Sequence, residues 1–309
     1  MKINNINITA IIFFFFTIST FSQQDSTITA DYQFVILADN LNFPEGPAWD
    51  SNGNLFVSSC YGGYIFEISK DSSFKFVDST QKPFKLKQTN GLTFDKDGNI
   101  FACDYGIGAI LKISPSGNTE IYASGYNNKK FNRPNDLAFA PNGNLYFTDP
   151  KSYGKDKPDG IVYMIKQKTK EVIPAADSIC FPNGITFSLD AKKLFVCESA
   201  QNRILSFDVD KDGKLRNKNV FVELPGGDPD GIAFDQNGNL YAAHFGGGNI
   251  FVISPEGKII NKIETPGKKP SNVEFGGKDL KTLFITEDET NSVYKTEVKI
   301  PGAKLFYSP

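Results

Sequence analysis

The sequence is poor in the residues that several common functions require. Among its 309 residues are only four cysteines and one histidine, and the formal net charge is −2. A chain this close to neutral has no basic surface for nucleic acid, so we expect no nucleic-acid partner. The cysteines match no zinc-binding spacing, and no Gly-x-Ser-x-Gly motif or P-loop lysine is present. A cysteine-based zinc site, a serine hydrolase and a P-loop nucleotide site are therefore disfavoured.

Long apolar runs are also scarce, and the one exception lies at the N-terminus. Lys2 precedes an apolar stretch over residues 8–18, and the chain turns polar from Ser19. This pattern is typical of a signal peptide, which we place at residues 1–23. The stretch is short for a membrane span, although an uncleaved anchor stays an alternative. We expect export to the periplasm or the extracellular space, with no stable membrane association after cleavage.

The few cysteines leave two interpretations open. Cys103 and Cys197 occupy the same position of a repeated phrase described below, at the end of an expected strand. Burial as small apolar side chains is the preferred interpretation for the cysteines. Because an exported protein can oxidise its thiols, a Cys180–Cys197 disulfide is the alternative.

One phrase, by contrast, occurs six times, and its first residue carries a side-chain oxygen in every copy. The clearest copy runs Asn90-Gly-Leu-Thr-Phe-Asp-Lys-Asp-Gly-Asn-Ile-Phe-Ala. Successive copies are 45, 45, 48, 47 and 41 residues apart, a spacing typical of propeller blades of four strands. The six copies begin at Glu45, Asn90, Asn135, Asn183, Asp230 and Ser271.

Each copy predicts a blade. An apolar alternation is followed by an Asn-Gly or Asp-Gly turn, which accepts the positive φ of a tight hairpin, and then by a second strand. A glycine-rich break, a third strand and a further turn lead to a fourth strand. We therefore predict an all-β fold over residues 31–300, a six-bladed β-propeller with four-stranded antiparallel blades around a central channel. Residues 31–40 or the C-terminal tail would complete the ring, and a solenoid or tandem array is disfavoured.

The first position of the phrase should form a ring around the channel, because the innermost strands of all blades lie beside the axis. Carboxylate and carboxamide oxygens without His or Cys suit Ca²⁺, with Mg²⁺, Mn²⁺ or Zn²⁺ as alternatives. Two carboxylates, Glu45 and Asp230, would balance a divalent charge and would repel each other without it. The competing interpretation is that Asn and Asp are merely turn formers at strand starts.

The residues around these positions resemble the senescence marker protein/gluconolactonase family of six-bladed propellers, and more distantly diisopropyl fluorophosphatase and the paraoxonases. The resemblance covers residues 35–297. It rests on Phe43-Pro-Glu45-Gly-Pro, Thr89-Asn-Gly-Leu, Phe131-Asn-Arg-Pro-Asn-Asp-Leu, Tyr146-Phe-Thr-Asp149-Pro, Phe181-Pro-Asn183-Gly and Asp228-Pro-Asp230-Gly.

The resemblance implies that Glu45, Asn183 and Asp230 are the core metal ligands. Asn135 would be a fourth ligand or a substrate contact, and Asn90 and Arg133 would face the substrate. Members of the family hydrolyse lactones, and some hydrolyse phosphotriesters.

These residues can perform that chemistry. A bound cation can polarise a lactone carbonyl and lower the pKa of a bound water. Asp230 would act as general base or as nucleophile, and Arg133 would stabilise an oxyanion or hold a hydroxyl or carboxylate group. We therefore predict a metal-dependent, gluconolactonase-like carboxylic ester hydrolase acting on a small-molecule lactone, a sugar lactone in particular. A non-enzymatic propeller with a structural Ca²⁺ ion and a phosphotriesterase-like hydrolase are the alternatives.

Four further residues have weaker assignments. Asp149, at an expected strand end, is a candidate substrate contact or a turn cap, and Asp136 is a candidate for orienting its neighbours. His244 could face the pocket, but a structural role is preferred, and a lone histidine rules out the histidine pair of a paraoxonase-like mechanism. Ser271 has no predicted role.

Overall fold

The computed structural model describes residues 32–306 except 51, 71, 79 and 81–83. The predicted signal peptide, residues 1–23, lies outside these described residues. Within them, no helix has both the length and the apolar character needed to cross a membrane.

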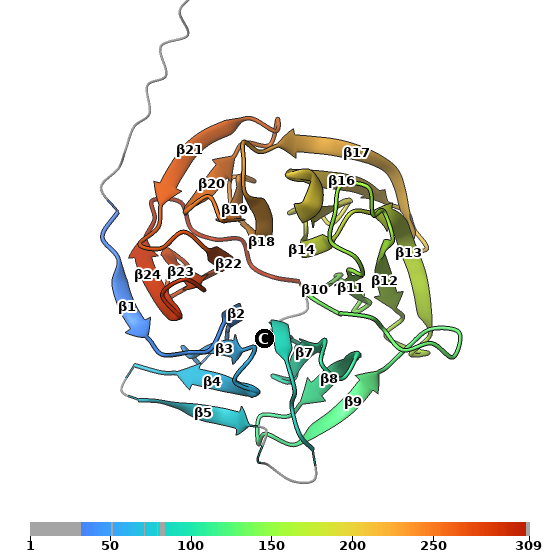
Figure 1. Ribbon diagram of the computed structural model, residues 1–309, viewed down its shortest axis with the longest axis horizontal. Helices are drawn as coiled ribbons and strands as arrows, with labels where there is room; N and C mark the ends of the chain where they lie inside the picture. The colour runs from blue at the N-terminus through green and yellow to red at the C-terminus, as the bar shows by residue number, and fades with distance from the viewer. Residues whose placement is uncertain (1–31, 51, 71, 79, 81–83, 307–309) are drawn as a thin grey trace, which may run out of the picture.

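Six antiparallel four-stranded sheets surround a central axis, so the predicted six-bladed β-propeller is confirmed (Figure 1). Blade 1 contains β2 (Pro44–Trp49), β3 (Leu55–Ser59), β4 (Tyr64–Ile68) and β5 (Ser73–Asp78). Blade 2 contains β6 (Thr89–Phe94), β7 (Ile100–Asp104), β8 (Ala109–Ile113) and β9 (Thr119–Ala123). Blade 3 contains β10 (Leu137–Phe139), β11 (Leu145–Asp149), β12 (Gly160–Ile165) and β13 (Val172–Ile179). Blade 4 contains β14 (Pro182–Phe187), β15 (Lys193–Glu198), β16 (Arg203–Val209) and β17 (Leu215–Glu223), with the short helix η1 (Ser199–Gln201) after β15. Blade 5 contains β18 (Asp228–Phe234), β19 (Leu240–Phe245), β20 (Asn249–Ile253) and β21 (Ile259–Glu264).

Blade 6 combines both ends of the chain and closes the ring. Its inner strands are β22 (Pro270–Gly276), β23 (Thr282–Glu287) and β24 (Ser292–Glu297), and its outer strand is β1 (Val35–Ala38). Strand β1 pairs antiparallel with β24, with Ile36 opposite Tyr294. Of the two predicted ways to complete the ring, the N-terminal one is therefore correct, and this pairing covers the outer edge of β24.

The predicted turns fix the register of the innermost hairpins. The Asp95 Oδ1 atom accepts the N–H groups of Asp97 and Asn99, both at 2.9 Å, and Gly98 takes a φ of +75°. Asp50 and Asp235 hold the turns of blades 1 and 5 in the same way. The Asp-x-x-Gly-Asn part of the phrase is thus a turn in which a carboxylate satisfies the loop amides.

One aromatic contact recurs at every blade interface and explains why the chain is rich in phenylalanine. A ring on the second strand of each blade packs against a ring on the first strand of the next, with centroids 5.0–5.4 Å apart. Five of the six pairs meet edge to face, an arrangement that aromatic quadrupoles favour. The pairs are Phe56–Phe94, Phe101–Phe139, Tyr146–Phe187, Phe195–Phe234, Tyr241–Phe275 and Phe284–Trp49.

In five blades the phrase begins at the second or third residue of the innermost strand, and in blade 3 Asn135 lies two residues before β10. Asn90, Asn183 and Asp230 lie within β6, β14 and β18, and the pairing register shifts just after them. Such bulges commonly re-aim side chains beside functional sites. A glycine follows because neighbouring inner strands nearly touch: a Cβ on Gly184 would collide with the backbone carbonyl of Asp230. These positions lie at or next to the starts of the innermost strands, as the turn-former interpretation also expects, so their role as ligands stays a prediction.

All four cysteines are buried and free, so the alternative of a Cys180–Cys197 disulfide does not hold. Their small side chains fill the protein interior, as the preferred interpretation predicts.

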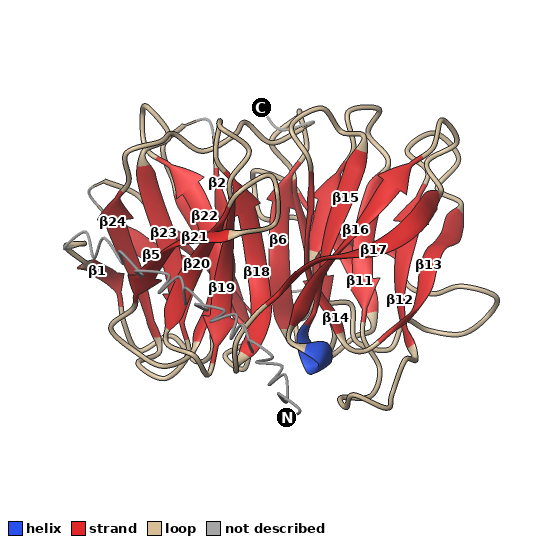
Figure 2. Cartoon of the chain, turned by 90° about the horizontal axis from the view of Figure 1, so that it is seen from above, coloured by secondary structure: helices blue, strands red, loops and turns tan. Residues whose placement is uncertain are grey.

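The tail after β24 forms no strand but crosses one end of the central channel (Figure 1). Gly302 pairs with Asp235, and the Ala303 N–H donates to the Phe234 carbonyl at 2.8 Å. Figure 2 shows this tail at the face of the disc opposite to helix η1.

Candidate functional site

A small cavity of about 160 Å³ opens at the end of the channel where helix η1 lies. It brings together six of the residues that the sequence singles out as metal or substrate contacts: Glu45, Asn90, Arg133, Asn135, Asn183 and Asp230. The remaining lining residues are Phe43, Tyr61, Tyr105, Pro150, Phe181, Ser199, Asp228 and Phe245.

Two of the three carboxylates that line the cavity, Glu45 and Asp230, have strongly raised pKa values. Burial, together with the negative charge of Asp136, raises the pKa of Glu45 to about 8. Burial and the charges of Glu45 and Asp288 raise the pKa of Asp230 well above its ordinary value. These shifts follow from placing several carboxylates in a desolvated channel.

The donor set fits a hard divalent cation. The Asp230 Oδ1 atom is buried and has no hydrogen-bond partner in the described protein, which is costly for a carboxylate. Carboxylates alone cannot form the site, because the described residues include no group of three or more His, Cys, Asp or Glu placed to hold a metal. Glu45 and Asp230 would have to act with the carboxamides of Asn135 and Asn183, a mixture of oxygens that suits Ca²⁺.

Arg133 stands at the rim of this cavity between two aromatic rings. Its guanidinium carbon lies 5.6 Å from the ring centre of Tyr105 and 5.7 Å from that of Phe181. No carboxylate of the described chain forms an ion pair with it. Cation–π contacts on two sides therefore hold the group while leaving its N–H donors free for a ligand.

The sequence analysis missed most of the aromatic rim. Phe43 and Phe181 line the cavity with φ values of +62° and +59°, a conformation that is strained for a bulky residue. Phe43 packs on Tyr61 at 4.7 Å and faces Phe245 at 6.4 Å. The sequence contained a signal for these two residues, because each lies two positions before a start of the phrase and is followed by a proline.

A cross-blade contact on the same rim was also missed. The hydroxyl of Tyr153, from the loop between β11 and β12, donates to the Asp228 carboxylate at 2.9 and 3.1 Å. Tyr153 also packs edge to face on Phe181 at 5.3 Å. Loop 151–160 therefore leans from blade 3 over the wall of the cavity.

Asp149 does not line the cavity. Both of its oxygens accept loop amides: Oδ1 takes the Arg133 N–H at 2.6 Å and Oδ2 the Asn132 N–H at 3.0 Å. Of its two predicted roles, this geometry supports the loop-holding one. Its direct contact with a substrate stays a prediction.

Ser271 and His244 also lie outside the cavity lining. The Ser271 hydroxyl donates to the Pro44 carbonyl at 2.8 Å and meets the Thr286 hydroxyl at 2.8 Å, so it ties blade 6 to blade 1. His244 packs on Phe251 at 4.8 Å between ring centres. Burial lowers the pKa of His244, as expected for a structural, neutral imidazole.

Asp136, the residue after Asn135, joins two blades. Its Oδ1 accepts the Leu137 N–H at 2.9 Å and its Oδ2 the Ile185 N–H of the next blade at 3.1 Å. Four other blades carry a glycine at this position, and a Cβ on one of them, Gly91, would collide with the Asp136 Oδ1 atom. Burial raises the pKa of Asp136 to about 7.

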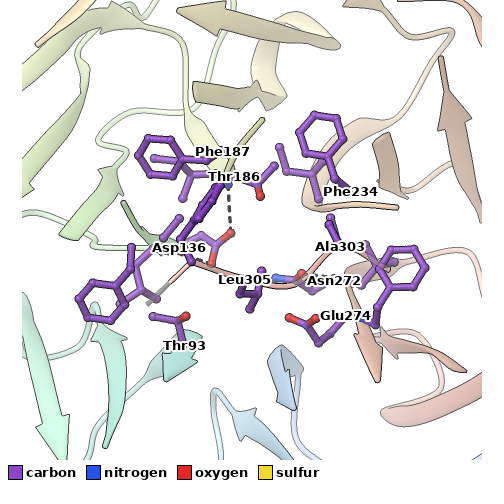
Figure 3. A pocket seen from close by; sticks show the side chains of 18 of the residues that line it. Thr93, Asp136, Thr186, Phe187, Phe234, Asn272, Glu274, Ala303 and Leu305 are labelled. Atoms are coloured by element: carbon purple, nitrogen blue, oxygen red, sulfur yellow. Dashed lines mark hydrogen bonds between the residues drawn. The ribbon is translucent and has the colours of Figure 1, made fainter. Parts of the chain in front are cut away.

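Asp136 faces a second, larger cavity of about 460 Å³ at the opposite end of the channel (Figure 3). Thr93, Asn272 and Glu274 also line this cavity, and Leu305 of the tail lies across it. It contains none of the six residues at which the phrase begins. The smaller cavity is therefore the candidate active site.

Known proteins share this fold. A family model described as the SMP-30/Gluconolactonase/LRE-like region matches residues 43–288. The chain is 29% identical over 164 residues to a 6-deoxy-6-sulfogluconolactonase of Pseudomonas putida, a match covering 48% of this chain and 56% of the relative. It is 35% identical over 144 residues to a diisopropyl-fluorophosphatase of Loligo vulgaris, covering 44% and 46%. These matches span about half of each relative.

A solved structure supports the comparison over a longer range. The gluconolactonase of Xanthomonas campestris superposes with a TM-score of 0.76 at 27% identity, covering 88% of this chain and 90% of that one.

Proposed function

The chain belongs to the SMP-30/gluconolactonase/LRE-like family, and we propose that it is a metal-dependent hydrolase that opens the ring of a sugar lactone. One observation carries this proposal. Two buried carboxylates with raised pKa values, Glu45 and Asp230, meet the carboxamides of Asn135 and Asn183 in a small cavity, and the Asp230 Oδ1 atom has no hydrogen-bond partner among the described residues. The names of the lactonase relatives support the substrate class.

Glu45, Asn135, Asn183 and Asp230 would hold the cation, with Ca²⁺ as the preferred ion. When bound, the cation supplies a positive charge that ionises the two carboxylates and polarises a carbonyl oxygen.

Asp230 would take a proton from the water that attacks the lactone carbonyl, and would return it to the ring oxygen when the ester C–O bond breaks. The product would be a hydroxy acid. Direct attack by the carboxylate is the alternative route through the same residue.

Arg133 and Asn90 would bind the hydroxyl groups of the lactone. The guanidinium is held in place by Tyr105 and Phe181, so its donors lose little freedom on binding a ligand. The aromatic rim would cover the apolar face of a sugar ring and exclude water. Localisation outside the cytoplasm is part of the proposal, and N-terminal sequencing of the mature protein tests it.

The test is hydrolysis of a lactone panel before and after chelation, with Glu45→Gln and Asp230→Asn beside the wild type. We expect chelation to abolish turnover, added Ca²⁺ to restore it, and both variants to lose at least about 100-fold in kcat/KM. Full activity after chelation would contradict the metal dependence. Because one relative is a diisopropyl-fluorophosphatase, the panel includes a phosphotriester, and turnover of that compound alone would favour this second candidate.

A further inference from the structure

A further acidic side chain lies near the candidate site and has no explained role. Asp288 follows directly after β23 and is only 8% exposed. Neither of its carboxylate oxygens has a hydrogen-bond partner in the described protein. An ionised carboxylate and a protonated one would both be unsatisfied there, so the protein alone does not account for this buried group.

The propeller repeat shows at which end of the channel Asp288 lies. The residue one place after the second strand is Tyr105 in blade 2, Pro150 in blade 3 and Ser199 in blade 4, and in blade 5 Phe245 is the last residue of β19. All four line the small cavity. Asp288 follows the second strand of blade 6 and so lies at the same end of the channel, although neither Asp288 nor the blade 1 residue at this place, Cys60, is among the lining residues.

Its electrostatic neighbours agree with this position. Among nearby charges, that of Glu45 acts most strongly on Asp288, and the Asp288 charge in turn acts on Asp230. Asp230, Asp288 and Glu45 come from blades 5, 6 and 1, which are adjacent in the closed ring. Asp288 thus comes from the blade that lies between those of Asp230 and Glu45.

In blade 6 the first residue of the phrase, Ser271, does not line the cavity, so this blade supplies no ligand from that position. The Ser271 hydroxyl is engaged with the Pro44 carbonyl and with Thr286. We propose that Asp288 is the acidic residue that blade 6 supplies to the cation site, and that its negative charge strengthens binding of a divalent cation held by Glu45 and Asp230. This inference rests on the metal-dependent function proposed above.

Asp288 acts in this account through its charge and not as a ligand. The three acids do not form a group placed to hold a metal together, so Asp288 stands outside the coordinating set. It is a positioning residue, comparable to the outer partners that tune metal affinity in other proteins.

Calorimetric titration of the full-length protein with Ca²⁺, and in parallel with Mn²⁺, tests the inference. We expect Asp288→Asn to weaken binding about tenfold or more, the usual effect of losing an outer partner. The matched control is Asp97→Asn, which removes the same charge from an exposed turn and creates the Asn-Gly pair found in other blades. We expect this control to bind within about twofold of the wild type, since exposed charges are largely screened.

Thermal unfolding in chelator separates a charge effect from a structural one. Asp288→Asn removes a buried, unpaired carboxylate, so the metal-free variant should melt at or above the wild-type temperature. Unchanged cation affinity would overturn the inference alone, and weaker affinity together with a lower melting temperature in chelator would assign Asp288 a structural role and also overturn it. Absence of cation binding by the wild type would overturn the metal-dependent function as well.

Discussion

The carboxylate of Asp149 holds the backbone of Arg133, whose N–H donates to its Oδ1 atom at 2.6 Å. Asp149, which lies outside the cavity lining, therefore positions Arg133 at the rim of the cavity. The same device appears in blade 2, where the Asp104 carboxylate accepts the N–H groups of Lys87 and Gln88. Carboxylates at the ends of second strands organise the loops that shape the site.

Removing Arg133 should weaken the binding of a hydroxylated or anionic lactone. A charged hydrogen bond contributes about 1.5–3 kcal/mol, so we expect Arg133→Ala to lower kcat/KM about tenfold to 100-fold. Asp149→Ala should cause a loss in the same direction because the loop is released, and Asp149→Asn, which keeps one acceptor, should cause a smaller one. Steady-state kinetics on the preferred lactone measures the loss of kcat/KM in the three variants. A wild-type kcat/KM in Arg133→Ala would contradict the predicted role of Arg133 in binding.

His244 should be dispensable for catalysis. It lies outside the cavity lining and is buried against Phe251, so its loss removes packing and not a reacting group. We expect His244→Gln to lower the free energy of unfolding by about 1–3 kcal/mol and to keep kcat within about threefold. Urea unfolding and lactone turnover check this, and a folded variant without activity would show that the imidazole takes part in the chemistry.

Glycine at the second position of the phrase is required by the neighbouring blade. A Cβ on Gly184 would collide with the Asp230 carbonyl, whereas one on Gly226 would meet no atom within 4 Å. We expect Gly184→Ala to cost about 3 kcal/mol through overpacking. Gly226→Ala should cost about 1 kcal/mol, because only its φ of +63° is unfavourable. Denaturant unfolding compares the two, and equal costs would contradict the close approach of β14 and β18.

The metal-free protein should lose stability as the pH rises. Glu45 and Glu274 have ordinary pKa values of 4.5 and folded values of about 8, both mainly because of burial. Between these pH values the folded state binds more protons than the unfolded state, so the free energy of unfolding falls as protons are removed. We expect the melting temperature in chelator to fall from pH 5 to pH 8.

Saturating Ca²⁺ should reduce this fall, because the cation compensates the ionised carboxylate of Glu45. A melting temperature in chelator that rises steadily over the same range would contradict the burial of these acids.

The periodicity of the sequence was the main basis for predicting the fold. The spacing of the six phrases and their Asn-Gly turns predicted six blades, and the aromatic pairs such as Phe56–Phe94 follow from residues at fixed places in the phrase. The sequence did not decide which end of the chain supplies the strand that closes the ring, because β1 carries no copy of the phrase. Its pairing with β24 depends on contacts that are distant in the sequence.

Only the site residues that occupy a repeated position of the phrase could be predicted from the sequence. Glu45, Asn183 and Asp230 occupy one position of the phrase, so symmetry alone brings them together around the axis. Tyr153 reaches the site from an irregular loop, and no periodic signal marks it. Asp288 occupies a repeated position whose residue type differs in every blade, so only the structure shows what its neighbours have in common.

The most direct test of the central claim is an anomalous difference map of crystals grown with Mn²⁺ and, separately, with Ca²⁺. The account predicts one strong peak in the small cavity, within about 2.0–2.6 Å of oxygens from Glu45, Asn135, Asn183 and Asp230. A cavity holding only ordered water at saturating cation, with the peak elsewhere on the propeller, would contradict it.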